Sequence, residues 1–166
     1  MRRKVLSVLL LFCSLLLVSC GGEEKKFLAI GDKAPDFTVI SMTGETITLS
    51  DWEGSPVVLR FWDTECKYCR ADTPIFNYYF AKYKEKGLHV LYVNTGQEPL
   101  AVVESFVKDL EISFPVIAQG GDAVGKQYNV KIVPQTIFLS PDGTIMTAIL
   151  GGVGEAEFNE ILGAYL

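Results

Sequence analysis

Two apolar runs near the middle of the chain mark the centre of the predicted fold. Residues 56–62 and 88–94 are almost continuously apolar, which is typical of strands buried on both faces of a sheet. A helix is expected between them over residues 67–86, ending at Gly87, because glycine commonly follows the last helical residue. Strand, helix and strand in this order predict parallel strands joined by a crossover.

Shorter blocks extend this pattern on both sides. Residues 36–40 and 46–49 are strand-like on either side of a turn at 42–45, which predicts a hairpin at the start of the domain. The later expected elements are helix 98–110 with Pro99 in its first turn, strand 114–118, helix 123–128, strands 135–139 and 144–150 around the turn Pro141-Asp142-Gly143, and helix 155–166. Together these elements predict an α/β fold with a mixed central sheet and helices on both faces.

The first 19 residues have the pattern of a secretory signal of lipoprotein type. A basic start, Arg2-Arg3-Lys4, precedes an apolar run over residues 5–18. That run is shorter than the roughly 20 residues that span a bilayer, and its place at the N-terminus favours a signal peptide. It ends in Leu17-Val18-Ser19-Cys20, which resembles a bacterial lipobox, so Cys20 is expected to become the acylated N-terminus. The alternative is a free cysteine of the core at this position.

Charge bears on the partners of the processed chain. The full sequence has 15 basic and 20 acidic residues, and the leader contains three of the basic ones. The remainder is strongly acidic, which argues against nucleic acid as a partner and against electrostatic capture by anionic lipid. Membrane attachment would therefore come from the lipid on Cys20. Residues 20–27 are expected to form a tether, and residues 28–166 a single domain large enough for its own core.

The cysteine count points to a working site. Of the four cysteines, Cys13 leaves with the leader and Cys20 takes the lipid, so Cys66 and Cys69 remain. A single pair of cysteines two residues apart cannot provide the disulfide framework that stabilises small exported domains, so the pair is expected to be a reactive site. The alternative, a zinc knuckle, needs two more ligands, and the single histidine, His89, is expected to be a half-buried strand residue. No metal and no cofactor are expected.

The position of the pair favours thiol–disulfide chemistry. Cys66 and Cys69 come directly after a buried strand and open the next helix. A helix N-terminus has unpaired N–H groups and a partial positive charge, and both stabilise the thiolate that acts as the nucleophile. Cys66 is nearer the helix end and is expected to attack a substrate disulfide. Cys69, one turn further in, would then resolve the mixed disulfide.

The chain resembles the TlpA/ResA-like extracytoplasmic thiol–disulfide oxidoreductases of the thioredoxin superfamily over nearly the whole processed sequence. The motifs that carry the resemblance are Gly31 to Phe37, the turn Thr43-Gly44-Glu45, Phe61-Trp62, Cys66-x-x-Cys69-Arg70, Pro74, the αβ unit over residues 98–118, and Val133-Pro134-Gln135-Thr136. The resemblance implies a thioredoxin-like fold with an N-terminal β-hairpin extension and a central αβ insertion.

The resemblance also implies roles for residues around the pair. Pro134 would be cis and face the two sulfurs, and Val133 would present its backbone to an extended substrate segment. Asp72 matches an acidic residue of ResA-like members, where a carboxylate would raise the pKa of the Cys69 thiol and could shuttle its proton. The alternative for Asp72 is an acid that complements the helix dipole.

Three positions depart from the usual pattern of the superfamily. Glu65 replaces the usual tryptophan before the first cysteine, and Lys67-Tyr68 replaces the common x-Pro between the cysteines. Arg60 lies where thioredoxins have a buried acid. Arg60 would favour a thiolate, whereas Glu65 and Asp72 oppose one, and the residues alone leave the net effect on redox potential open.

The expected protein is a monomeric, membrane-anchored enzyme facing the periplasm or extracytoplasmic space. By the resemblance it reduces protein disulfides, such as those of apocytochrome c, with electrons from a membrane thiol donor; an oxidant or isomerase remains open. A peroxiredoxin-type peroxidase would need Pro and Thr where Leu59 and Asp63 stand. A copper-delivery protein of SCO type would need a Cys-x-x-x-Cys pair and a histidine after His89, and the chain has neither.

Overall fold

The computed structural model describes residues 28–166. The predicted leader, Cys20 and the tether lie outside these residues. In the described part of the chain, no helix has the length and apolar character needed to cross a membrane.

A five-stranded mixed sheet forms the centre of the domain, with the strand order β5-β4-β3-β6-β7. Its strands are β3 (Val57–Trp62), β4 (His89–Asn94), β5 (Val116–Ile117), β6 (Gln135–Leu139) and β7 (Ile145–Leu150). The first three run parallel to one another, and β6 and β7 pair antiparallel. A separate antiparallel hairpin precedes them, made of β1 (Thr38–Ile40) and β2 (Thr46–Thr48). This confirms the predicted mixed sheet and the N-terminal hairpin.

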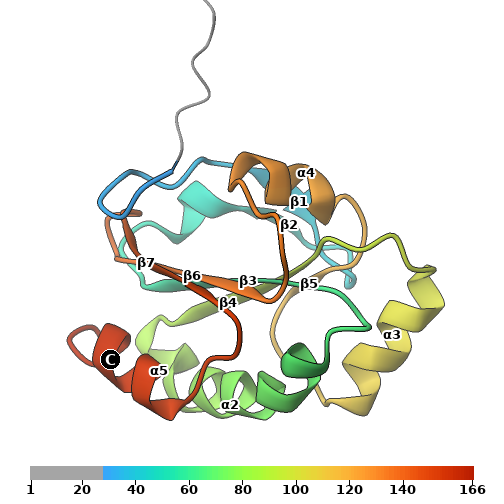
Figure 1. Ribbon diagram of the computed structural model, residues 1–166. Coiled ribbons are helices and arrows are strands. Elements are labelled where there is room, and N and C mark those ends of the chain that lie inside the picture. The colour runs from blue at the N-terminus through green and yellow to red at the C-terminus, as the bar shows by residue number, and fades with distance from the viewer. Residues whose placement is uncertain (1–27) are drawn as a thin grey trace, which may run out of the picture.

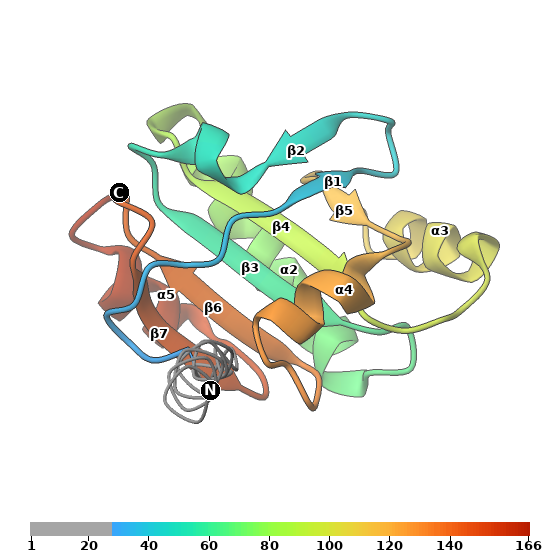
Figure 2. The same cartoon turned by 90° about the horizontal axis from the view of Figure 1, so that it is seen from above.

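Helices cover both faces of the sheet (Figures 1 and 2). One face carries α2 (Lys67–Tyr83), α3 (Leu100–Asp109) and α5 (Glu155–Leu162), whereas α4 (Gly121–Gln127) lies on the other face with the hairpin. Two short 3₁₀ helices, η1 (Leu49–Trp52) and η2 (Lys84–Lys86), complete the described elements. The predicted central αβ insertion corresponds to α3 and β5.

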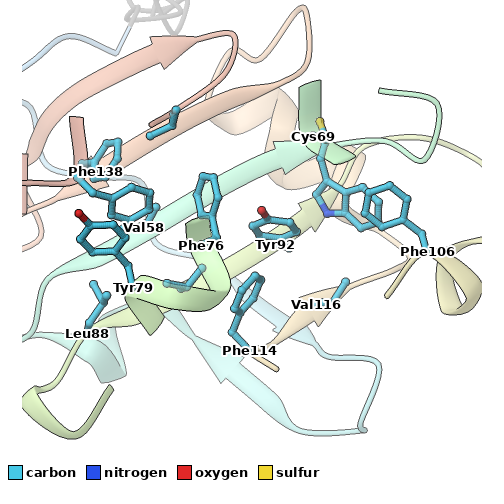
Figure 3. Close-up of a cluster of buried hydrophobic side chains, with 14 of the residues drawn as sticks. Val58, Cys69, Phe76, Tyr79, Leu88, Tyr92, Phe106, Phe114, Val116 and Phe138 are labelled. Atoms are coloured by element: carbon cyan, nitrogen blue, oxygen red, sulfur yellow. The ribbon is translucent and has the colours of Figure 1, made fainter. Parts of the chain in front are cut away.

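Alternation along β3 produces two cores, one on each face. All six residues of β3 are buried. Val57, Leu59 and Phe61 belong to the cluster on the α4 side, while Val58 and Trp62 belong to the cluster under α2, α3 and α5. Figure 3 shows the second cluster, to which Cys69 belongs. The redox pair therefore rests directly on the core.

Several element ends differ from the prediction. Pro99 lies at the N-cap of α3 rather than in its first turn, since Leu100 is the first helical residue. The last helix ends at Leu162 instead of residue 166. The active-site helix changes to 3₁₀ geometry after Tyr83 and stops at Gly87, whose φ of 94° is the left-handed conformation that glycine adopts most easily.

The strand register gathers distant connections at one edge of the sheet. Trp62, the last residue of β3, is opposite Asn94, the last of β4. Gln135, the first residue of β6, is opposite Phe61 and also opposite Leu150 at the end of β7. The loops that follow β3, β4 and β7 and the loop that precedes β6 therefore all meet at the edge where α2 begins.

Candidate active site

Cys66 and Cys69 form a disulfide at the first turn of α2, with their Cα atoms 5.3 Å apart. Cys66 is the N-cap of the helix, and its Sγ accepts a hydrogen bond of 3.1 Å from the backbone N–H of Cys69. Cys69 is completely buried, whereas Cys66 is half-buried. A substrate can therefore reach only the first sulfur directly, and that sulfur also has the hydrogen-bond donor that would stabilise its thiolate.

The peptide bond between Val133 and Pro134 is cis, which confirms this part of what the resemblance implies. Pro134 is buried, and it immediately precedes β6 at the edge of the sheet where Cys66 lies. Gly151 N–H donates to Pro134 O at 2.8 Å, so the loop after β7 is attached to this proline. The loop bearing Pro134 and the redox pair therefore share one edge.

Arg60 is a fully buried residue of β3, the strand that precedes the pair. Its guanidinium donates to Asp72 Oδ2 at 2.5 Å, to Thr136 Oγ1 at 2.6 Å and to Gly151 O at 3.1 Å. The guanidinium carbon also lies 5.0 Å from the centre of the Phe76 ring, a cation–π contact. One side chain of β3 thus connects the active-site helix, the strand after the cis-proline and the loop after β7.

Asp72 is the ion-pair partner of Arg60, a contact that the sequence did not predict. Its Oδ2 also accepts the Val153 N–H at 3.0 Å, and its Oδ1 is buried without a hydrogen-bond partner among the described residues. Burial raises the pKa of Asp72, and the Arg60 guanidinium opposes that rise. Because two N–H donors, one from a permanent cation, converge on Oδ2, we treat the pair as ionic at neutral pH.

The alternative role for Asp72, complementing the helix dipole, is wrong. Asp72 lies in the second turn of α2, and the first turn of the helix has no acidic residue. The dipole acts on charges within the first turn. The carboxylate is instead turned inward to the buried guanidinium.

Glu65 is placed differently from Arg60 and Asp72. Glu65 is exposed, and its backbone N–H donates to Asp63 Oδ1 at 3.0 Å. Among the described residues the Glu65 carboxylate has no ion pair or hydrogen bond in the site. Any effect of Glu65 on the pair is therefore one of solvent-screened charge at the surface.

Sequence reasoning missed the polar contacts that Thr73 and Thr64 make next to the pair. The buried Thr73 hydroxyl donates to the carbonyl of Cys69 at 2.6 Å and lies 3.2 Å from the Tyr92 hydroxyl. Burial raises the pKa of Tyr92, so this phenol stays neutral. On the other side of the pair, Thr64 donates to the carboxylate of Glu98. A threonine in a helix and a tyrosine in an apolar strand gave no signal in the sequence.

The described residues contain no group of three or more His, Cys, Asp or Glu side chains that could hold a metal ion. His89 is half-buried at the start of β4, as predicted, and stacks on Trp52 with ring centres 4.5 Å apart. Burial lowers the pKa of His89. It therefore lies in a packing contact at the opposite end of β4 from the pair.

Comparisons with known proteins agree with this geometry. A family model described as the AhpC/TSA family matches residues 30–148. Thiol-disulfide oxidoreductase ResA of Geobacillus kaustophilus (strain HTA426) is 35% identical over 162 residues, 98% of this chain and 92% of that protein. ResA of Bacillus cereus (strain ATCC 10987 / NRS 248) is 35% identical over 140 residues, 84% of this chain and 79% of that protein.

A solved structure is similar over most of the described domain. The crystal structure of a Chlorobium tepidum chain assigned as thiol:disulfide interchange protein DsbE has a TM-score of 0.75 and 33% identity. The match covers 84% of this chain and 99% of that chain. StoA from Bacillus subtilis matches with a TM-score of 0.66 at 23% identity, which shows the shared fold alone.

Proposed function

We propose that this chain, which belongs to the AhpC/TSA family and is a ResA-like thiol–disulfide oxidoreductase of the thioredoxin superfamily, reduces protein disulfides outside the cytoplasm. The observation that carries the proposal is the Cys66–Cys69 disulfide at the N-terminus of α2, with a half-buried first sulfur and a buried second one. This arrangement supports Cys66 as the attacking thiol and Cys69 as the resolving thiol.

The reaction proceeds in two exchanges, starting from the reduced dithiol. The Cys66 thiolate attacks one sulfur of the substrate disulfide; a Cys66–substrate disulfide forms, and the other substrate sulfur leaves as a thiolate that takes up a proton. Cys69 then loses its proton and attacks Cys66 Sγ, which restores the Cys66–Cys69 disulfide and releases the second substrate sulfur. Two electrons pass from the protein dithiol to the substrate.

Three neighbours would support these steps. The Cys69 N–H, 3.1 Å from Cys66 Sγ, would stabilise the attacking thiolate. The backbone of Val133, before the cis-proline, would hold an extended substrate segment, because an exposed backbone edge can pair with an added strand. Asp72 Oδ1, which has no hydrogen-bond partner among the described residues, would accept the proton of Cys69.

The buried ion pair of Arg60 and Asp72 supports a protein that reduces substrate disulfides rather than one that oxidises substrate thiols. An unpaired cation behind the cysteines would stabilise a thiolate, favour the reduced protein and make it an oxidant. Asp72 Oδ2 lies 2.5 Å from a guanidinium nitrogen of Arg60 and neutralises its charge, so the stabilisation of a thiolate by Arg60 is largely cancelled. We therefore infer a potential near that of thioredoxin, about −270 mV, rather than near that of the strong oxidant DsbA, about −120 mV.

The sequence of the leader supports the place of action. The basic start, the short apolar run and the lipobox-like Leu17-Val18-Ser19-Cys20 favour export and a lipid anchor at Cys20. By resemblance to ResA-like proteins, the substrates would include the haem-binding cysteines of apocytochrome c, and a membrane thiol carrier would supply electrons. We propose a monomer that acts at the outer surface of a membrane.

A trapping experiment tests the assigned order of the two cysteines. Cys69→Ser keeps the attacking thiol and removes the resolving one, so it should accumulate mixed disulfides with substrate proteins on non-reducing gels. Cys66→Ser is the matched control, since it keeps a buried thiol and should trap little or nothing. Equal trapping by both variants, or trapping by Cys66→Ser alone, would refute the order.

A further inference from the structure

The loop that carries Cys66 is attached to a carboxylate from a distant part of the chain. Thr64, two residues before Cys66, donates two hydrogen bonds to Glu98 Oε1, one of 2.7 Å from its backbone N–H and one of 2.8 Å from Oγ1. Glu98 lies 34 residues further on, in the connection between β4 and α3. The two connections adjoin because Trp62 and Asn94, the residues before them, are paired in the sheet.

The local backbone leaves room for this carboxylate at Gly96. A Cβ added to Gly96 would lie 2.0 Å from Glu98 Oε2, so any other residue there would displace the carboxylate. Oε2 itself is buried and has no hydrogen-bond partner in the part of the chain described. A buried, unpartnered carboxylate oxygen costs free energy in the folded state. Holding the Glu98 carboxylate in this place therefore costs free energy that an exposed acid would not cost.

The ionisation of Glu98 follows largely from the same contacts. Burial would raise the pKa of the Glu98 carboxyl, but the two hydrogen bonds from Thr64, together with the backbone of Glu98 and the nearby Asn94 side chain, outweigh burial and hold its pKa below the usual range. Glu98 is thus a carboxylate at neutral pH. Both Thr64 donors point at one charged oxygen, and such charge-assisted hydrogen bonds are stronger than neutral ones.

We propose that Glu98 is a positioning residue that fixes Thr64 and, through it, the attacking Cys66 at the start of α2. The inference rests on the proposed role of Cys66 as the attacking thiol. Within the same loop Glu65 N–H donates to Asp63 Oδ1 at 3.0 Å, so residues 63–66 form a turn with a hydrogen bond of its own. Glu98 anchors this turn to the connection after β4.

The position of the turn decides how well Cys66 reacts. While the turn is fixed, Cys66 Sγ stays 3.1 Å from the Cys69 N–H, which favours its thiolate. When the turn moves, that hydrogen bond weakens and the sulfur loses its alignment for attack. Small misplacements of a reacting group are known to slow reactions by up to about a hundredfold.

A pair of substitutions at one position separates hydrogen bonding from charge. Glu98→Gln removes the charge, but its amide oxygen can still accept both hydrogen bonds from Thr64. Glu98→Ala removes the charge and the acceptor together. Because both variants lack the charge, any difference between them reports the hydrogen bonds to Thr64.

The readouts are the thiol pKa of Cys66, from the pH dependence of its alkylation by iodoacetamide, and kcat/KM for reduction of insulin disulfides. We expect the pKa of Cys66 to be higher in Glu98→Ala than in Glu98→Gln. We expect kcat/KM to be about tenfold lower in Glu98→Ala, with Glu98→Gln within about threefold of wild type. Glu104→Ala, which removes an exposed acid from α3, is the matched control and should resemble wild type.

Other patterns overturn the inference. If Glu98→Gln is as slow as Glu98→Ala, charge and not hydrogen bonding matters; if both match wild type, Glu98 does not position Cys66. Should Glu98→Ala fail to fold, as judged by near-ultraviolet circular dichroism, Thr64→Val against Thr64→Ser takes its place, with the valine variant slower by about threefold. A wild-type protein that reduces no disulfide would instead refute the proposed function.

Discussion

The buried pair of Arg60 and Asp72 offers a quantitative test of how this site is built. The side chain of Arg60 is completely buried and that of Asp72 is 9% exposed, with a separation of 2.5 Å. Removing one member of such a pair leaves an uncompensated buried charge, which costs about 3–5 kcal/mol. Replacing both members together removes that penalty. The pair should therefore show strong coupling in a double-mutant cycle.

The cycle consists of Asp72→Asn, Arg60→Met and the double variant. Asparagine can keep an acceptor where Oδ2 now receives the N–H groups of Arg60 and Val153, so the cost of Asp72→Asn should be at the lower end, about 3 kcal/mol. Arg60→Met should cost about 4 kcal/mol, and the double variant should recover at least about 2 kcal/mol of the summed loss. Urea denaturation of the oxidised proteins measures these free energies of unfolding.

The same variants should move the thiols in a defined direction. Asp72→Asn leaves the charge of Arg60 unbalanced behind the pair, so the pKa of the Cys69 thiol should fall and the reduction potential should rise. The expected rise is roughly 30 mV for each ~1.4 kcal/mol by which the thiolate is stabilised. The double variant should return both quantities toward wild type. Additive free energies, or an unchanged Cys69 titration in Asp72→Asn, would refute the idea that each residue masks the charge of the other.

Three further predictions concern other parts of the chain. Cys20→Ala should abolish fatty-acid labelling and membrane partitioning in the native host; unlabelled, soluble wild-type protein would contradict the anchor. His89, the only histidine, should show by NMR a pKa below the usual value of about 6.5. The free energy of unfolding should therefore fall as the pH drops below about 6.5 and His89 becomes protonated, and His89→Gln should remove this fall. Phe76→Ala should lower the free energy of unfolding by about 3–5 kcal/mol in urea, and a loss below about 1 kcal/mol would contradict its place in the core.

The fold followed from the sequence because its central strands have an unambiguous pattern. The continuous apolar runs predicted β3 and β4 within one residue of their observed starts, and the glycine at 87 predicted the end of the helix between them. Other helix ends were predicted less accurately. The predicted end at residue 166 was four residues too long, although Gly163 directly follows the last helical residue, Leu162, and marks the true end of α5.

The site was predictable only where local sequence determines it. The Cys66–Cys69 pair at a helix start and the cis-proline belong to short motifs, so their geometry could be expected. The Arg60–Asp72 pair could not, because it depends on which face of β3 meets which turn of α2. The contact between Thr64 and Glu98 depends on two loops and on the missing Cβ of Gly96, which no local pattern encodes.

The reduction potential of the Cys66–Cys69 pair tests the central claim most directly. It can be measured by equilibrating the purified domain in buffers of defined thiol–disulfide ratio and counting free thiols. A protein that reduces substrate disulfides, with Arg60 neutralised by Asp72, should give a value near about −270 mV. A value above about −180 mV, the range of protein disulfide isomerase, would contradict the account and make the protein an oxidant or an isomerase.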